Sequence, residues 1–229
     1  MATTAVKGRG AVQALAALAV ASPLLVLLSV VGVRSGLLPV ETGYDLLTLQ
    51  VAWWLSFAGA AAGVLAMLLA LRNFRALGFA ALAALLIGGG TLGGFVWQKR
   101  QLAAGPVENV STDLAEVPGF GQLRPDRMGG LQPAVGVEAC PGAAPVPTQI
   151  APESAAWALQ EAGFTLGRTG VARADGSRRT VWFGFGYDAV IRIRPGRTDI
   201  RVAARDGRPH GGEACRLVTR ISASLNDAL

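Results

Sequence analysis

The sequence predicts a bundle of three transmembrane helices followed by a small α+β domain, in which two helices pack on an antiparallel sheet. Three observations lead to this fold class. Up to about residue 97 the chain is rich in Leu, Ala, Val and Gly, whereas most of the Arg, Asp, Glu and Pro residues follow. Apolar and polar side chains then alternate on both sides of Pro195-Gly196, as in a β-hairpin. The last stretch, from about 212 to 228, has apolar residues at helical spacing.

Three apolar stretches are long enough to cross a membrane. Residues 11–33 hold no charge, and at a rise of about 1.5 Å per residue they would cross roughly 30 Å of hydrocarbon. A cleaved signal peptide is the rival interpretation, because Lys7 and Arg9 precede the stretch, but the apolar run continues too far. Residues 46–71 and 76–97 are joined by a short basic connector, which predicts an antiparallel hairpin. None of the three stretches contains an ionisable residue, so we interpret them as an anchor rather than a transport pathway.

Glycines in the second and third stretches predict close helix packing. They form small-x-x-x-small patterns that let two backbones approach each other. The glycines concerned are Gly59, Gly63, Gly90 and Gly94. We expect packing within one chain, and the alternative is a homo-oligomer formed through the same residues.

We divide the chain into four parts: a tail (1–10), the membrane region (11–98), a Pro/Gly-rich connecting segment (99–150) and the α+β domain (151–229). The connecting segment is expected to be mostly irregular, with one short strand at 109–113. In the domain we expect a helix at 152–162, strands at 164–172 and 180–185 with a turn at Gly176 between them, the Pro195-Gly196 hairpin and a helix at 212–228. The apolar stripe of the last of these helices consists of Leu217, Val218, Ile221 and Leu225.

The hairpin carries a row of arginines that is the best candidate for a binding site. If Ala189, Ile191 and Ile193 face the core, the intervening residues face outward, and so do alternate residues of the returning strand. The outward arginines are Arg192, Arg194, Arg201 and Arg205. Guanidinium groups bind phosphate or carboxylate, so anionic lipid is one expected partner. The other interpretation is internal pairing, because Asp188, Asp199 and Asp206 lie close in the sequence.

Other site chemistry has little support in the sequence. His210 is the only histidine, stands between Pro209 and two glycines, and is expected in an exposed loop, so no catalytic, metal-binding or cofactor-binding residue is assigned. Basic residues only slightly outnumber acidic ones in the second half, which does not favour nucleic-acid binding. Cys140 and Cys215 form no C-x-x-C pattern; they could pair in an oxidising compartment or be two unrelated side chains.

Several segments of the second half resemble a known family. Residues 109–113 with Pro118-Gly119-Phe120 resemble the opening of the domain-of-unknown-function family numbered 1499, in its membrane-fused, three-span alphaproteobacterial form. Residues 182–185 and 188–192 are similar to its second segment, and 201–216 to its third. The matching motif positions are Asp113, Phe183, Gly184, Phe185, Asp188, Arg201, Arg205, Gly207, Arg208, Gly212 and Arg216.

The chain would be a divergent member of that family. Tyr187 stands in place of an aspartate, Val202 and Ala204 in place of two serines, Pro209-His210 in place of a Ser-Asp pair, and Ala214 in place of an asparagine. A site built from those hydroxyl and carboxyl groups would be incomplete here. The resemblance implies a fold and an envelope setting, and it implies no activity.

The location and function follow as expectations. Lys and Arg near the span ends are slightly more frequent on the side of the N-terminus, which predicts a cytoplasmic N-terminus and, after three spans, a C-terminal domain outside the cytoplasm. With the family's setting, this gives a multi-pass protein of the bacterial inner membrane with a periplasmic domain. We expect a non-enzymatic envelope module that binds a partner protein or anionic lipid. The alternative is an enzyme or metal-dependent domain acting on envelope material, with a site near Asp188, Arg205, Arg208 and His210.

Overall fold

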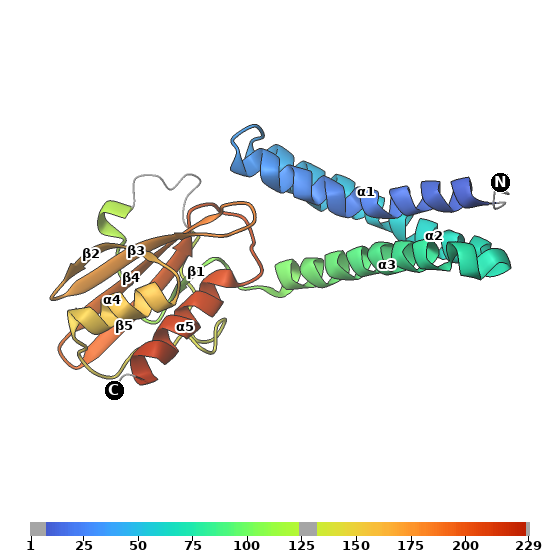
Figure 1. Cartoon of the computed structure of the whole chain (residues 1–229). Helices are drawn as coiled ribbons and strands as arrows, with labels where there is room; N and C mark the ends of the chain where they lie inside the picture. The colour runs from blue at the N-terminus through green and yellow to red at the C-terminus, as the bar shows by residue number, and fades with distance from the viewer. Residues whose placement is uncertain (1–7, 124–131, 228–229) are drawn as a thin grey trace. The chain divides into compact units, whose positions relative to one another are not determined.

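The computed structural model describes residues 8–123 and 132–227. The chain forms two compact units, Met1–Lys99 and Arg100–Leu229. Figure 1 shows helices in the first unit and a sheet with helices in the second. Each unit is described by itself below.

The first unit contains two helical stretches that are long and apolar enough to cross a membrane. The first is α1 (Arg9–Arg34). The second is a helical run of 64 residues, Glu41–Ala104, made of the π-helix η1 (Glu41–Ala52), α2 (Trp53–Ala70), the 3₁₀-helix η2 (Leu71–Asn73) and α3 (Phe74–Ala104). The structure therefore gives two candidate spans where the sequence predicted three. The connector contains no Gly or Pro that would end a helix, and its backbone tightens into η2 instead.

Small residues bring the helices of this unit into contact. A Cβ atom on Gly63 would lie 2.7 Å from the Cα of Leu85, and one on Gly88 would lie 2.5 Å from the carbonyl oxygen of Gly59. The α2 and α3 backbones therefore touch, and the run bends back at η2. Gly59 also lies against Ala19 of α1. A Cβ on Gly90 or Gly94 would meet nothing within 4 Å, so self-association through that part of α3 stays a prediction.

The second unit is built on one antiparallel sheet of five strands in the order β1-β5-β4-β3-β2. The strands are β1 (Asn109–Ser111), β2 (Thr165–Gly170), β3 (Arg173–Arg179), β4 (Gly186–Arg194) and β5 (Arg197–Ala204). The helices α4 (Pro152–Glu161) and α5 (Glu213–Asp227) lie together against one face of the sheet (Figure 1). The α+β architecture and both helices are confirmed.

The face under the helices is the main hydrophobic core. It receives Ala189, Ile191 and Ile193 of β4 and the matching residues of β5, so the predicted alternation of the hairpin is correct. Gly196 has a φ of 73°, as the turn after Pro195 requires. The stripe of α5 is buried in this core; its residues are Leu217, Val218, Ile221 and Leu225.

Two predictions about the middle of the sheet are wrong. Gly176 does not make a turn: it lies within β3 opposite Ala189, where a Cβ would fall 2.9 Å from the carbonyl oxygen of Thr165. The glycine is needed there for close packing between strands. Residues 180–185 are a loop rather than a strand, closed by hydrogen bonds between Thr180 and Phe185 and turned by Gly184, with a φ of 74°.

The connecting segment is an integral part of the second unit. It supplies β1, and its bridges join Val110 to Val135 and Val146 to Thr198. Cys140, Ala143, Val146 and Ile150 are buried in the main core. The compact unit therefore begins near Arg100 rather than at residue 151.

Candidate functional site

The second face of the sheet carries the arginine row, and among the described residues it is covered by an irregular segment that ends in the short 3₁₀-helix η3 (Gly121–Leu123) rather than by an α-helix. Arg192, Arg194, Arg201 and Arg205 lie on this face with Val190 and Ala203, opposite the main core. Residues 112–123 lie over the face and bring Asp113, Glu116 and Phe120 to it. We call residues 112–123 the cover segment and the arginine-bearing side of the sheet the arginine face.

Three carboxylates sit among the guanidinium groups of Arg192, Arg194 and Arg197. Arg192 and Arg194 each place Nη2 2.9 Å from Oδ2 of Asp113. Asp199 pairs with Arg197 at 2.7 Å and also contacts Arg192 and Arg194. Glu116 completes the group, with Oε2 2.6 Å from Nη1 of Arg194. The predicted internal pairing is thus present for this half of the row.

Apart from the exposed Glu116, exposure separates the charges of this cluster into two layers. The side chain of Asp199 is fully buried and that of Asp113 is 9% exposed, whereas Arg192, Arg194 and Arg197 are 20%, 32% and 43% exposed. The backbone N–H of Glu116, together with Arg194, holds the pKa of Asp113 below its usual value although burial opposes the shift. The carboxylate of Asp113 therefore stays ionised beneath the guanidinium groups that face solvent.

The other two arginines of the row hold the fold together. Arg201 donates to the carbonyl of Pro118 at 2.8 Å and lies over the ring of Phe120, so it fixes the cover segment. Arg205 binds both carboxylate oxygens of the buried Asp188, at 3.1 and 2.9 Å. Of the predicted anion-binding residues, Arg192 and Arg194 line a hollow.

That hollow lies where the cover segment meets the ends of β3 and β4. It has a volume of about 350 Å³. Its lining consists of Pro118, Gly119, Ala172, Arg173, Val190, Arg192, Ile193 and Arg194. We call it the arginine hollow. Aliphatic groups form much of its surface and three guanidinium-bearing side chains border it, which suits a ligand with both an anionic and an apolar part.

The four residues of the predicted enzyme site do not converge. Asp188 and Tyr187 are neighbours on β4 and point to opposite faces of the sheet. Asp188 and Arg205 consequently lie on the arginine face, while His210 contacts Tyr187 on the core side. Arg208 is 3.8 Å from Asp206 on the loop after β5.

His210 is not an exposed loop residue, contrary to the prediction. Its side chain is only 5% exposed, stacks on Phe185 with ring centroids 4.2 Å apart, and hydrogen-bonds the Tyr187 hydroxyl through Nδ1. The reason is that Tyr187 is fully buried and its hydroxyl needs a polar partner. Gly211, with a φ of 75°, turns the chain so that the loop can bring His210 inward.

Tyr187, His210 and Asp206 form a chain of polar contacts. Nε2 of His210 is 3.1 Å from Oδ1 of Asp206. Burial raises the pKa of Tyr187 strongly, and nearby carboxylates add to the effect. Burial also acts to raise the pKa of Asp206, but its contact with His210 outweighs that and leaves the pKa lowered. The phenol stays protonated and buried, so a substrate has no access to it.

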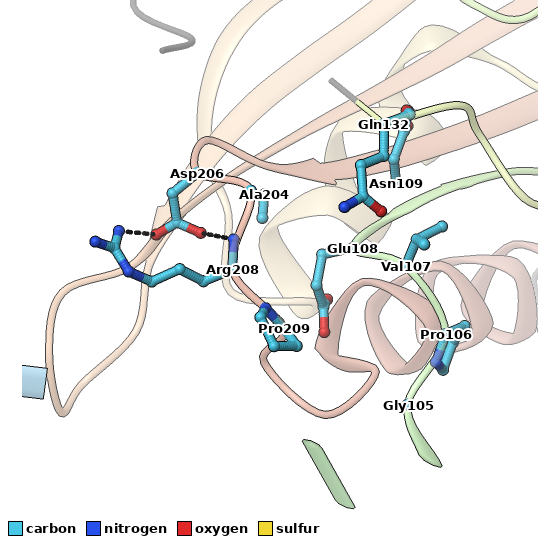
Figure 2. A pocket seen from close by; sticks show the side chains of 11 residues that line it. Gly105, Pro106, Val107, Glu108, Asn109, Gln132, Ala204, Asp206, Arg208 and Pro209 are labelled. Atoms are coloured by element: carbon cyan, nitrogen blue, oxygen red, sulfur yellow. Dashed lines mark hydrogen bonds and ion pairs between the residues drawn. The ribbon is translucent and has the colours of Figure 1, made fainter. Parts of the chain in front are cut away.

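A second hollow, of about 220 Å³, lies beside this chain. Figure 2 shows Asp206 and Arg208 paired at its side and Glu108 on its wall. Glu108 is engaged elsewhere: its carboxylate accepts hydrogen bonds from the backbone N–H groups of Gly212 and Ala214 at 2.8 Å, and more weakly from those of His210 and Glu213. It caps the start of α5 and interacts favourably with the helix dipole.

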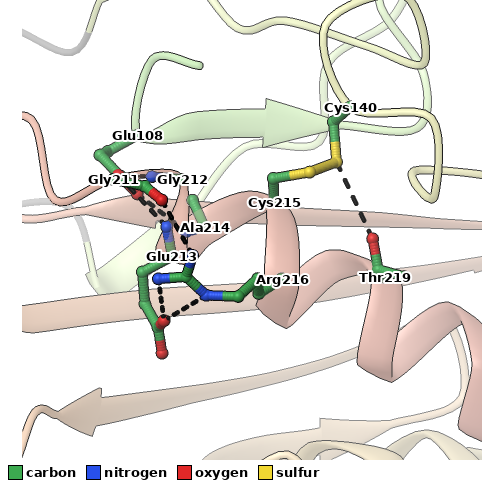
Figure 3. The surroundings of a disulfide bond; sticks show 9 residues. All are labelled: Glu108, Cys140, Gly211, Gly212, Glu213, Ala214, Cys215, Arg216 and Thr219. Carbon is green, nitrogen blue, oxygen red and sulfur yellow. Dashed lines mark hydrogen bonds and ion pairs between the residues drawn. A yellow bond between two sulfur atoms is a disulfide. The ribbon is translucent and has the colours of Figure 1, made fainter. Parts of the chain in front are cut away.

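Cys140 and Cys215 form a disulfide that ties the connecting segment to the first turn of α5 (Figure 3). Gly142 fits next to this bond because a Cβ there would fall 2.2 Å from Oγ1 of Thr219. The pairing that the sequence left open is therefore present in the structure. Gly212 and Arg216 of the family motif lie at the same helix start, where Arg216 donates to the carbonyl of Gly211 and to Glu213.

The remaining positions of the family motif lie in packed rings and in a loop. Phe183 packs near Phe185, and Phe185 supports His210. Gly207 lies in the open loop after β5. Within residues 8–123 and 132–227, no group of three or more His, Cys, Asp and Glu side chains is arranged to hold a metal ion.

Comparisons with known proteins give no relative. No protein-family model matches the chain, and no curated protein or solved structure is detectably similar to it.

Proposed function

We propose that this chain is a membrane-anchored, non-enzymatic module of the bacterial envelope whose second unit binds an anionic lipid headgroup on the arginine face. One observation carries the proposal: two of the cluster's three carboxylates, Asp113 and Asp199, are buried, and the guanidinium groups above them are partly exposed. The three carboxylates and three guanidinium groups balance in number, yet the groups that face solvent are three cations and one anion, Glu116. This layer, which has a net positive charge, attracts the phosphate groups of a bilayer surface.

The proposed setting is the inner membrane, with three crossings, a cytoplasmic N-terminus and a periplasmic second unit. The contact between Gly63 and Leu85 supports a reversal between the second and third crossings, because both helices must run side by side. The Cys140–Cys215 disulfide supports an oxidising compartment. The motif resemblance to the family numbered 1499 supports the same setting.

Location is tested by labelling in intact cells. A membrane-impermeant thiol reagent is expected to label the full-length chain only after treatment with an impermeant reductant, because Cys140 and Cys215 are its two cysteines and they are paired. Labelling without reduction would contradict the disulfide. Labelling only after the cells are broken would contradict the periplasmic placement.

Binding is tested with the full chain in nanodiscs of neutral phosphatidylcholine. We expect it to float with vesicles containing about 30 mol% phosphatidylglycerol and not with pure phosphatidylcholine vesicles, and to be released in about 0.5 M NaCl. Arg194→Glu should abolish flotation. Arg220→Glu is the matched control, because Arg220 is an exposed arginine on α5, on the other side of the sheet. Equal loss in both variants would contradict a specific site.

The enzyme interpretation has no comparable support. Asp188 and Arg205 lie on the arginine face, His210 contacts Tyr187 on the core side, and Arg208 lies on the loop after β5. Binding to a partner protein is the outcome that remains if the arginine face retains its structure in the full chain but the vesicles do not bind.

A further inference from the structure

We propose that the carboxylate of Glu116 occupies the place of the ligand's anionic group, and that a single anionic amphiphile displaces it and fills the arginine hollow. This inference rests on the proposed function and names the ligand class for the same site: one phosphate or carboxylate group joined to a short apolar part. Glu116 then acts as an internal competitor for the site.

Glu116 differs from every other carboxylate of the cluster in its exposure. Its side chain is 69% exposed, whereas those of Asp113 and Asp199 are 9% and 0% exposed. Its two oxygens contact two arginines, Oε2 at 2.6 Å from Nη1 of Arg194 and Oε1 at 3.4 Å from Nη1 of Arg192. A phosphate group bridges two guanidinium groups in the same way.

Displacing Glu116 costs little, because an exposed ion pair contributes little to stability. Arg192 and Arg194 would keep Asp113 and Asp199 as partners, so neither guanidinium group would lose its place. Arg192 also donates to the backbone carbonyl of Glu116, and this bond does not require the side chain. The cover segment can therefore stay in position while the carboxylate leaves.

Two of the arginines that line the hollow carry hydrogen-bond donors that no described residue accepts. Arg173 binds Asp175 through Nε, but its Nη2 is buried and has no acceptor in the part of the chain that the structure describes. Nε of Arg192 is likewise buried and lacks an acceptor among the described residues. Both side chains line the arginine hollow. Buried donors of this kind are uncommon in folded proteins, and a small movement of either side chain would turn them toward the oxygen atoms of a ligand.

The shape of the hollow favours an amphiphile over a free ion. Pro118, Ala172 and Val190 contribute to its lining, and a bare phosphate would leave this apolar surface uncovered. An acyl or glyceryl group attached to the phosphate would cover this apolar surface, and removing the surface from water would add to the free energy of binding. Gly119 also lines the hollow, and a Cβ there would meet no heavy atom within 4 Å.

The test uses the full chain in phosphatidylcholine nanodiscs and isothermal titration calorimetry. The probes are dihexanoyl phosphatidic acid, dihexanoyl phosphatidylcholine and inorganic phosphate, all below micelle-forming concentrations. We expect only the first to bind well. Glu116→Gln should tighten its binding by about fivefold or more, because the competing charge is removed. Glu138→Gln removes the same charge from an exposed position elsewhere in the unit and should change nothing.

Two further variants examine the hollow itself. Arg194→Ala should weaken binding of the short-chain phosphatidic acid by about tenfold or more. Gly119→Val should weaken it as well, while leaving any weak binding of inorganic phosphate unchanged.

The outcomes separate this inference from the function on which it rests. If Arg194→Glu abolishes vesicle flotation but Glu116→Gln binds like the wild type, the competitor role of Glu116 is wrong and the lipid-binding function stands. If inorganic phosphate binds as tightly as the amphiphile, the assignment of the hollow is wrong. If wild type and Glu116→Gln bind neither vesicles nor short-chain lipid, both proposals fail.

Discussion

The two faces of the five-stranded sheet are covered in opposite ways. On one face, α4 and α5 bury Ile191, Ile200 and their neighbours in a continuous apolar core. On the other face, the cover segment is held by ion pairs, by backbone carbonyls that accept from Arg192 and Arg201, and by a small apolar cluster in which Phe120 packs on Val190 and Ala203. The first face gains stability from area removed from water, and the second depends on a few directional contacts. The difference indicates that one face supports the fold and the other can exchange partners.

The largest expected effect is on the helix-covered face. Leu217→Ala should lower the free energy of unfolding of the second unit by about 3 kcal/mol, because the side chain is buried and its removal leaves a cavity. Hydrogen exchange of α5 peptides in the full chain measures this. Arg220→Ala is the exposed control on the same helix and should change the value by less than about 0.5 kcal/mol.

On the arginine face, the largest expected loss comes from Asp199. Asp199→Asn should lower the free energy of unfolding by about 2 kcal/mol, because it removes a buried charge that three guanidinium groups share. The loss is limited because these guanidinium groups are partly exposed and water can solvate them. The same exchange measurement on β4 and β5 checks it. A loss as large as that of Leu217→Ala would mean that the ionic face contributes to the fold as strongly as the apolar core.

Alkaline pH should act on the helix-covered face. The pKa of Tyr187 is raised above its unfolded value of 10.0, so its contribution to stability is complete below pH 10 and decreases as pH rises. The loss should approach about 1.4 kcal/mol per pH unit above roughly pH 10. Tyr187→Phe should flatten this dependence. An unchanged slope in that variant would show that other groups cause it.

Acid should act on the arginine face. The pKa of Asp113 is below its unfolded value of 3.8, so the ionised carboxylate stabilises the folded state above that pH, and the contribution is lost as pH falls through the folded-state pKa. Exchange of cover-segment amides should therefore accelerate in acid before that of α5. Asp113→Asn should reduce the difference between the two regions. If the cover segment and α5 opened at the same pH, the cover segment would not be attached separately by ion pairs.

The smallest expected effect on stability is that of Glu116→Gln, less than about 0.5 kcal/mol, because the ion pairs of this carboxylate are exposed. Thermal unfolding of the full chain measures it. A substantial loss would place Glu116 among the residues that hold the cover, and an unchanged stability separates its effect on ligand affinity from any effect on folding.

Local patterns predicted the helix-covered face well. Alternation around Pro195-Gly196 and the helical spacing of Leu217 and Ile221 each depend on neighbours in the sequence, and the structure agrees with both. Gly176 was taken as a turn because a glycine in a short polar stretch suggests one. Its actual role, space for the backbone near Thr165, depends on a neighbouring strand. The membrane region was predicted as three spans because charges interrupt the apolar run, yet the helix continues through Leu71–Asn73.

The arginine face could be predicted only in part. The row itself was visible, and Asp199 was near enough to be considered as its partner. Asp113 and Glu116 lie about eighty residues earlier, and no local spacing connects them to Arg192 and Arg194. The position of Asp113 in the motif resemblance was the one signal that pointed to it. His210 was misplaced for a similar reason, because the buried hydroxyl that attracts it belongs to Tyr187 on another strand.

The bond between Cys140 and Cys215 closes a ring of chain that includes α4 and the strands β2 to β5. A protease that cut one exposed turn in this ring, such as the one at Val171, would leave both pieces covalently joined. The severed protein would migrate as one species until a reductant was added. A single nick would therefore not release the arginine-bearing strands from the residues that precede Val171.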